Sequence, residues 1–121
     1  MTIRDMQKLI DSTWDWGFLK DCFGSTNIEP TDIDGFVERN GEFLVIETKL
    51  PNNKITTGQA IAFRAMVNIG RFAVILIWGK PGFPERVVTI TGKGEVEHDP
   101  SIEKIKELVS KWFQYADRKS R

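Results

Sequence analysis

Residues 43–50 read Phe-Leu-Val-Ile-Glu-Thr-Lys-Leu, an apolar run that ends in a carboxylate and an amine two positions apart. An apolar run of this length is typical of a strand that is buried on both faces of a sheet. Because residues i and i+2 of a strand share a face, Glu47 and Lys49 are expected to project together, roughly 6.6 Å apart along the chain. A charged side chain is costly at such a place unless it is paired or binds a metal. The run therefore predicts a core strand with a functional group at its end.

A second strand, just upstream, is expected to supply the partner of this pair. Residues 33–38 are predicted to be a strand, and the sequence that follows contains Asn40-Gly41, which is typical of a tight hairpin turn. A hairpin that turns at these two residues places Asp34 opposite Glu47, with Cβ atoms about 4.5–5.5 Å apart. Two carboxylates at this separation repel each other unless a cation lies between them or one of them is protonated.

The chemistry that this group predicts is metal-assisted attack on a phosphodiester. Carboxylate oxygens at this spacing suit Mg²⁺ or Mn²⁺, with water and a substrate phosphate as the remaining ligands. Such a metal lowers the pKa of a bound water and stabilises the charge that develops on the phosphate. Lys49, beside the metal, would orient or deprotonate that water or stabilise the transition state.

The segment before the hairpin is predicted from apolar spacing and capping residues. Residues 3–12 have the spacing of a helix, with Thr2 placed as its N-cap. An extension of this helix toward Phe18 and Leu19 is open, although Gly17 disfavours it. Residues 22–30 contain the Gly, Ser, Asn and Pro residues of a loop.

A helix and a second buried strand are predicted directly after the hairpin. Thr56 or Thr57 would cap a helix over residues 57–69, and Gly70 would end it. Residues 72–78 form another continuous apolar run, and strand, helix and strand in this order usually make a right-handed crossover to a parallel strand.

The rest of the chain is predicted to add an edge strand and a helix. Residues 80–84 have the composition of a turn or loop, and residues 86–91 alternate weakly, as an edge strand does. A last helix is expected to begin with Asp99 as its N-cap and Pro100 at its first helical position. The apolar face of this helix consists of Ile102, Ile105, Leu108, Val109, Trp112 and Ala116. These elements predict an α/β fold with a mixed sheet of about four strands and helices on its faces.

Length and composition place the protein among ordinary globular domains. A chain of 121 residues fits one domain, residues 1–121, and is long enough to bury a core. No apolar stretch approaches the about 20 residues that cross a bilayer, so no membrane partner is expected. The first residues lack the apolar core of a signal peptide. The single cysteine, Cys22, cannot form an internal disulfide, which favours a reducing cytoplasm.

The charges of the chain are segregated although their sum is zero. Residues 1–47 hold 4 basic and 10 acidic side chains, whereas residues 48–84 hold 5 basic side chains and no acidic one. An acidic cluster for cations beside a basic segment for phosphates is compatible with DNA binding. Lys54, Arg64 and Arg71 are the candidate phosphate contacts. An ordinary solvated surface explains the same segregation equally well.

With Asp34 followed by Glu47-Thr48-Lys49 at the end of an apolar strand, the chain resembles the PD-(D/E)XK nuclease superfamily. The resemblance covers residues 3–78 and implies a restriction-endonuclease-like core: a helix, a β-meander, a crossover helix and a further strand. It implies that Asp34 and Glu47 are metal ligands, that Lys49 is the catalytic lysine, and that Gln59 on the crossover helix belongs to the site. The proline of the family name is displaced to Pro30.

The displaced proline leaves two aspartates for one role. Pro30 precedes Thr31 and Asp32, so Asp32 competes with Asp34 as the main ligand. Spacing and hairpin register favour Asp34, and Asp32 alternates to the same face as a second metal ligand.

The function that the resemblance implies is that of a Mg²⁺- or Mn²⁺-dependent DNA endonuclease. With no room for a separate recognition domain, structure-directed cutting of branched or nicked DNA, a homodimer, or recruitment by a partner protein is expected. Compact members of this kind resemble Holliday-junction resolvases and small phage-type nucleases, which implies the cytoplasm of a bacterium or of a phage-infected host cell.

Two other interpretations account for the same residues. In one, the strand end is salt-bridged: Glu47 pairs with Lys49 or Arg64, and Asp34 is solvated. In the other, the fold is nuclease-like and the protein binds DNA, or acts as an adaptor, without cutting. The presence of both carboxylates and of the lysine argues against the second.

Overall fold

The computed structural model describes residues 2–120 and divides them into two compact units, one that ends at Thr31 and one that begins at Asp32. The first unit contains the helix α1, Ile3–Ser12, with Thr2 as its N-cap and Asp5 completing a capping box. This helix was predicted with the same bounds. It does not extend to Phe18, because a separate 3₁₀ helix, η1, covers Trp16–Phe23. The loop that was predicted from Cys22 therefore begins later, after η1.

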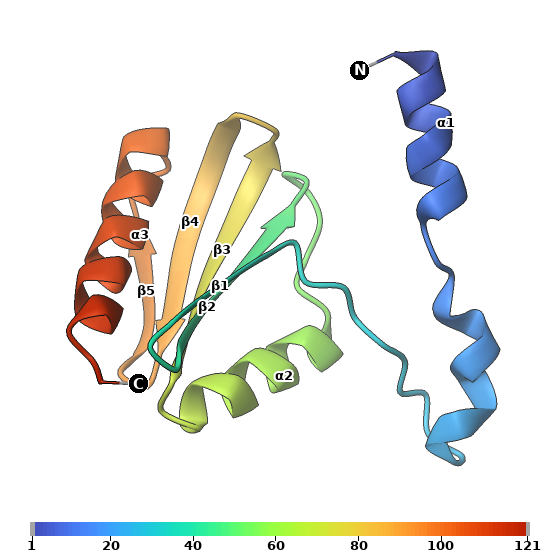
Figure 1. Ribbon diagram of the computed structural model, residues 1–121, viewed down its shortest axis with the longest axis horizontal. Helices are drawn as coiled ribbons and strands as arrows, with labels where there is room; N and C mark the ends of the chain where they lie inside the picture. Colours follow the sequence, from blue (N-terminus) through green and yellow to red (C-terminus); the bar gives the residue numbers. More distant parts are fainter. Residues whose placement is uncertain (1, 121) are drawn as a thin grey trace. The chain divides into compact units, whose positions relative to one another are not determined.

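The second unit is a five-stranded mixed sheet with two helices (Figure 1). In chain order its elements are β1 (Gly35–Arg39), β2 (Glu42–Lys49), α2 (Thr57–Asn68), β3 (Phe72–Lys80), β4 (Phe83–Thr91), β5 (Gly94–His98) and α3 (Ile102–Asp117). The strands lie in the order β1-β2-β3-β4-β5. Only β2 and β3 pair in parallel, and α2 connects them, as the strand–helix–strand order predicted.

Four predictions for this unit were wrong in detail. The first strand of the hairpin begins at Gly35 and ends at Arg39, instead of covering residues 33–38. The sheet has a fifth strand, so β4 is internal and β5 is the edge. The predicted loop over residues 80–84 is reduced to Pro81-Gly82, because pairing of β3 with β4 continues to Lys80 and Phe83. The N-cap of α3 is Ser101, whose hydroxyl accepts a 3.1 Å hydrogen bond from the Lys104 amide, and not Asp99.

The alternation of side chains along the strands divides the core between the two faces of the sheet. Val45, Val74 and Leu76 pack with Phe63 and Val67 of α2 on one face. On the other face, three buried strand residues pack against α3: Leu44, Ile75 and Val87. Glu47 and Lys49 have the same parity as Val45, so they project from the face that α2 covers.

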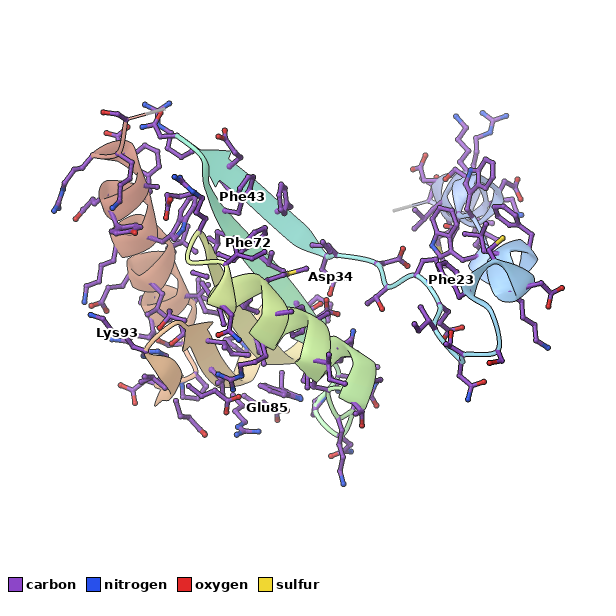
Figure 2. All side chains as sticks on the ribbon, turned by 90° about the horizontal axis from the view of Figure 1, so that it is seen from below. Phe23, Asp34, Phe43, Phe72, Glu85 and Lys93 are labelled. Atoms are coloured by element: carbon purple, nitrogen blue, oxygen red, sulfur yellow. The ribbon has the colours of Figure 1, made fainter. Side chains whose placement is uncertain are left out.

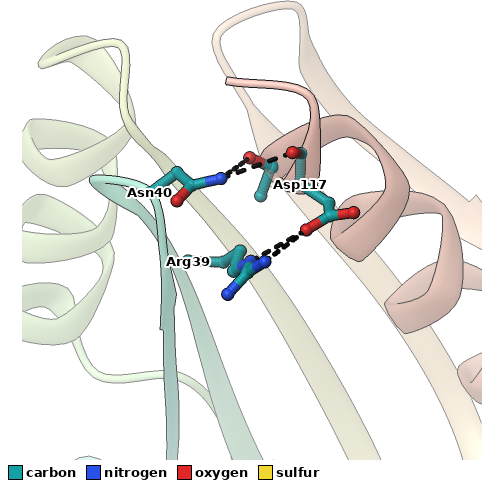
Figure 3. A network of polar contacts seen from close by, with 4 residues as sticks. Arg39, Asn40 and Asp117 are labelled. Carbon is teal, nitrogen blue, oxygen red and sulfur yellow. Dashed lines mark hydrogen bonds and ion pairs between the residues drawn. The ribbon is translucent and has the colours of Figure 1, made fainter. Parts of the chain in front are cut away.

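The β1–β2 turn sets the register of the first two strands. Asn40 and Gly41 have φ of 51° and 81°, the left-handed pair that a tight hairpin turn requires. The turn is held to the end of α3: the Arg39 guanidinium donates to Asp117 at 2.6 and 2.9 Å, and the Asn40 amide donates to the carbonyls of Ala116 and Asp117 (Figure 3). Gly35 consequently lies opposite Ile46, which is the register that the sequence predicted.

Candidate active site

Asp34 lies just before β1, one residue beyond the last pair of the β1–β2 ladder, and Glu47 is its counterpart on β2. Thr48 of β2, the neighbour of Glu47, holds the Asp34 carboxylate. Its backbone N–H donates to Asp34 Oδ2 at 2.9 Å, and its hydroxyl donates to the same oxygen at 3.0 Å. Asp34 is exposed, and Figure 2 shows it where the chain enters β1. This aspartate is therefore both oriented and accessible.

Glu47 is the opposite case, a carboxylate that is only 5% exposed. Its Oε1 receives a long, 3.5 Å contact from the Gln59 amide, and its Oε2 is buried without a hydrogen-bond partner. A buried carboxylate oxygen without a donor is unfavourable unless a proton or a cation occupies that side. Burial raises the pKa of Glu47 to about 7. The negative charge of Asp34, and the hydrogen bond that protonated Glu47 donates to Asp34, add to the increase, whereas the charge of Lys49 opposes it.

Gln59 reaches the site from the first turn of α2. Its side-chain oxygen accepts from the Thr56 backbone N–H at 3.2 Å, and the Thr56 hydroxyl accepts from the Gln59 N–H at 3.1 Å, so the two residues form a capping box. With the amide oxygen held by the helix N-terminus, the amide nitrogen of Gln59 is directed toward Glu47. The capping box thus fixes the orientation of the one side chain that α2 contributes.

Lys49 is half-buried on the face of Glu47, in the last position of β2 and opposite Trp78 of β3. Among the described residues, neither Lys49 nor Arg64 forms an ion pair with Glu47; Arg64 pairs with Glu95 on β5 instead. The structure therefore contradicts the salt-bridged strand end that was considered as an alternative, and Asp34 is hydrogen-bonded to Thr48 rather than only solvated.

The described residues contain no cluster of three or more His, Cys, Asp or Glu side chains that could hold a metal ion. Asp32 therefore does not join Asp34 and Glu47 in a three-carboxylate cluster, although its charge contributes to the raised pKa of Glu47. The pair of carboxylates still fits a hard cation, because Mg²⁺ usually takes one or two protein carboxylates and completes its shell with water and phosphate. The unpartnered Oε2 of Glu47 is the atom that such a cation would satisfy.

The three predicted phosphate contacts are separated in the structure. Arg71 lies at the start of β3 and pairs at 3.2 Å with Glu42, at the opposite end of β2 from Glu47. Arg64 is paired with Glu95 on the far edge strand. Only Lys54, in the loop after β2, lies at the same end of the sheet as the carboxylates. A cavity of about 700 Å³ lies around Glu42 and Arg71, away from the candidate site.

Two residues of the site were not predicted for their role. Thr48 was quoted only as the middle of Glu-Thr-Lys, yet its backbone and hydroxyl orient Asp34. The signal for it was the hairpin register, which brings residue 34 beside residues 47 and 48. Trp78 was covered only as the last residue of the apolar run 72–78; its indole N–H donates at 2.9 Å to the carbonyl of Asn53 and so ties the loop after β2 to β3.

A comparison of the chain with protein-family models, with curated proteins and with solved structures found no match. No helix within residues 2–120 is long and apolar enough to span a membrane.

Proposed function

We propose that this protein is a metal-dependent DNA endonuclease whose centre is Asp34, Glu47, Lys49 and Gln59. The observation that carries the proposal is the buried Oε2 of Glu47, which lacks a donor although a second carboxylate and a lysine share its surroundings. A strand end of purely structural purpose would be expected to pair this oxygen. Two carboxylates that can bind a metal ion, with a lysine beside them, are the groups that metal-assisted hydrolysis of a phosphodiester requires.

The proposal includes a restriction-endonuclease-like core of the PD-(D/E)XK type. The hairpin β1–β2, the crossover helix α2 and the parallel strand β3 support it, as does the position of Gln59 in the first turn of α2. The chain departs from the family pattern in one respect. Between Thr2 and Thr57 the structure has two strands, so a hairpin stands in place of the three-stranded meander.

Each side chain has a distinct task in the proposed reaction. Asp34 and Glu47 would hold the Mg²⁺ or Mn²⁺ ion, with the Asp34 carboxylate kept in place by Thr48. When bound, the ion supplies positive charge that activates water and neutralises charge on the phosphate. The Gln59 amide donates to Oε1 of Glu47 and so helps to orient its carboxylate. The Lys49 ammonium would stabilise the negative charge that the phosphate gains in the transition state.

The direct test is the cleavage of supercoiled, branched and single-stranded DNA by the purified protein with Mg²⁺ or Mn²⁺. We expect metal-dependent cutting that EDTA stops, and its loss in Glu47→Ala. DNA binding by wild type without any cutting would favour the other candidate, a silent DNA-binding or adaptor protein. Cutting that persists undiminished in Glu47→Ala would show that the nuclease centre lies elsewhere or that the activity is a contaminant.

The roles of the two aspartates are separated by their alanine variants. Asp34→Ala is expected to lower the cleavage rate at least tenfold more than Asp32→Ala, because Thr48 fixes the Asp34 carboxylate beside Glu47. Removing even a hydrogen-bonding partner of a metal ligand typically costs about 10- to 100-fold in metal affinity or activity, and removing the ligand itself is expected to cost at least as much. Rates measured at saturating Mg²⁺ would check the order of the two variants. A greater loss in Asp32→Ala would assign the ligand role to Asp32.

A further inference from the structure

The turn between β3 and β4 extends past the end of β2. Lys49, the last residue of β2, lies opposite Trp78, and β3 continues for two more residues to Lys80. Two residues of strand add roughly 7 Å. Pro81-Gly82 then turns the chain, and Phe83 pairs with Lys80 as the first residue of β4. The turn therefore projects beyond the level of Lys49 at the same end of the sheet as the candidate active site.

Phe83 is 75% exposed, more than any other aromatic side chain among residues 2–120. It makes no aromatic contact in the described structure, whereas the Phe43 ring stacks on Phe72 (Figure 2) and contacts Phe36 in a tilted arrangement. A single exposed apolar residue is unremarkable in itself. The position of Phe83, at the tip of a turn beside a candidate site for nucleic acid, distinguishes it from the others.

The backbone that carries Phe83 is restricted in conformation on both sides. Pro81 and Pro84 restrict φ near and after it. Gly79 has φ of 148° at a register shift in the ladder, and a Cβ there would lie 2.3 Å from the Phe83 carbonyl oxygen. This close approach fits only glycine. A restricted backbone means that little backbone entropy remains to be lost when the ring binds a ligand.

A cleft of about 560 Å³ lies between this turn, the end of β2 and the start of α3. It is lined by Thr48 and Lys49, by the turn residues Lys80, Pro81 and Gly82, and by Ile102 and Ile105 of α3. Neither carboxylate of the candidate active site lines it, so the cleft connects the turn to the end of β2 only. Within the described residues, no carboxylate pairs with Lys49, Lys54 or Lys80, whereas Arg64, Arg71 and Arg86 are all paired. The three lysines at this end of the sheet are thus available for phosphate.

We infer that Phe83 is a stacking platform for an unpaired base, with Lys80 contacting the adjoining phosphate, and that the preferred substrate is branched or single-stranded DNA. The inference rests on the proposed function and specifies its substrate class. Exposed aromatic rings bind bases by stacking, while lysines bind the backbone without regard to sequence. A base within an intact duplex is already stacked between its neighbours, so only an unpaired base is available to Phe83.

Binding of three labelled DNAs in EDTA tests the inference without cleavage: a 20-nucleotide single strand, its blunt duplex and a forked duplex. Phe83→Ala is expected to weaken binding of the single strand and the fork about tenfold and to leave the blunt duplex unchanged. Phe83→Trp should restore the binding. Lys80→Ala should weaken the binding of all three DNAs by the same factor and reduce the dependence of that binding on salt concentration. Phe113→Ala, an exposed aromatic on α3, is the control and should change none of them.

The outcomes separate the two proposals. Equal binding of the three DNAs by wild type and Phe83→Ala would overturn the stacking site, even if the protein cuts DNA with Mg²⁺. A selective loss in Phe83→Ala would support the stacking site even if no cutting is found, in which case the endonuclease proposal fails alone. Circular dichroism of each variant would confirm that it is folded, and a Phe83→Ala variant that is folded but loses duplex binding equally would also overturn the inference.

Discussion

Replacing Lys49 with alanine is expected to lower the rate of DNA cleavage by about 10²- to 10³-fold, the range measured when one transition-state contact is removed from an active site. The physical reason is the position of its ammonium group. Lys49 is half-buried, has no ion pair among residues 2–120 and shares a face with Glu47. Its ammonium group is therefore not held in a direct ion pair and is available to the phosphate.

The expected loss lies in the rate of the bound complex rather than in binding. Lys49→Ala should retain the stabilisation that Mg²⁺ confers on the folded protein, because both carboxylates remain. Lys93→Ala is the matched control: Lys93 lies at the β4–β5 turn, at the other end of the sheet (labelled in Figure 2), and its loss removes the same charge. Single-turnover rates at saturating DNA and Mg²⁺ would measure both variants. Equal rates for Lys49→Ala and Lys93→Ala would exclude a catalytic role for Lys49.

Replacing Glu47 with glutamine is expected to stabilise the metal-free protein above pH 7 by up to about 3 kcal/mol, which is the free energy equivalent of raising a pKa from 4.5 to about 7. Below pH 4.5 the carboxyl group is protonated in both the folded and the unfolded state, so its ionisation does not contribute to the stability difference between the two proteins. Between pH 4.5 and 7 the unfolded state loses the proton while the folded state keeps it. Wild type therefore loses stability over this interval relative to Glu47→Gln, and the full penalty is present above pH 7.

Urea unfolding of both proteins in EDTA at pH 4.5, 6 and 8 would measure this difference. Glu42→Gln is a matched control, since Glu42 is also 5% exposed on β2 but is paired with Arg71. This control should gain no stability at pH 8. Added Mg²⁺ should reverse the order, because a ligand that binds only the folded state stabilises it, and only wild type keeps the full carboxylate pair. A stability difference between wild type and Glu47→Gln that does not change with pH would show that the carboxyl group is not perturbed.

The elements around the site were predictable because their signals are local. The Asn40-Gly41 turn determines the register of the hairpin, and the register places Asp34 beside Glu47 by counting alone. Thr56 and Gln59 form a capping box three residues apart, so the start of α2 was readable as well. The strand β5 was not predictable from its sequence. It contains Glu95 and Glu97 on an exposed edge of the sheet and therefore shows no apolar alternation.

The sequence by itself determined which charged residues would share a strand face and which hairpin register would bring a second carboxylate to them. Both follow from the period of two in a strand and from a two-residue turn, which are properties of neighbouring residues. Only the tertiary structure decided that Glu47 would be buried with one oxygen unpartnered, that Thr48 would hold Asp34, and that Phe83 would project past Lys49. These features depend on how β3 and α2 pack against β2, and burial and hydrogen-bond partners are set by residues distant in the sequence.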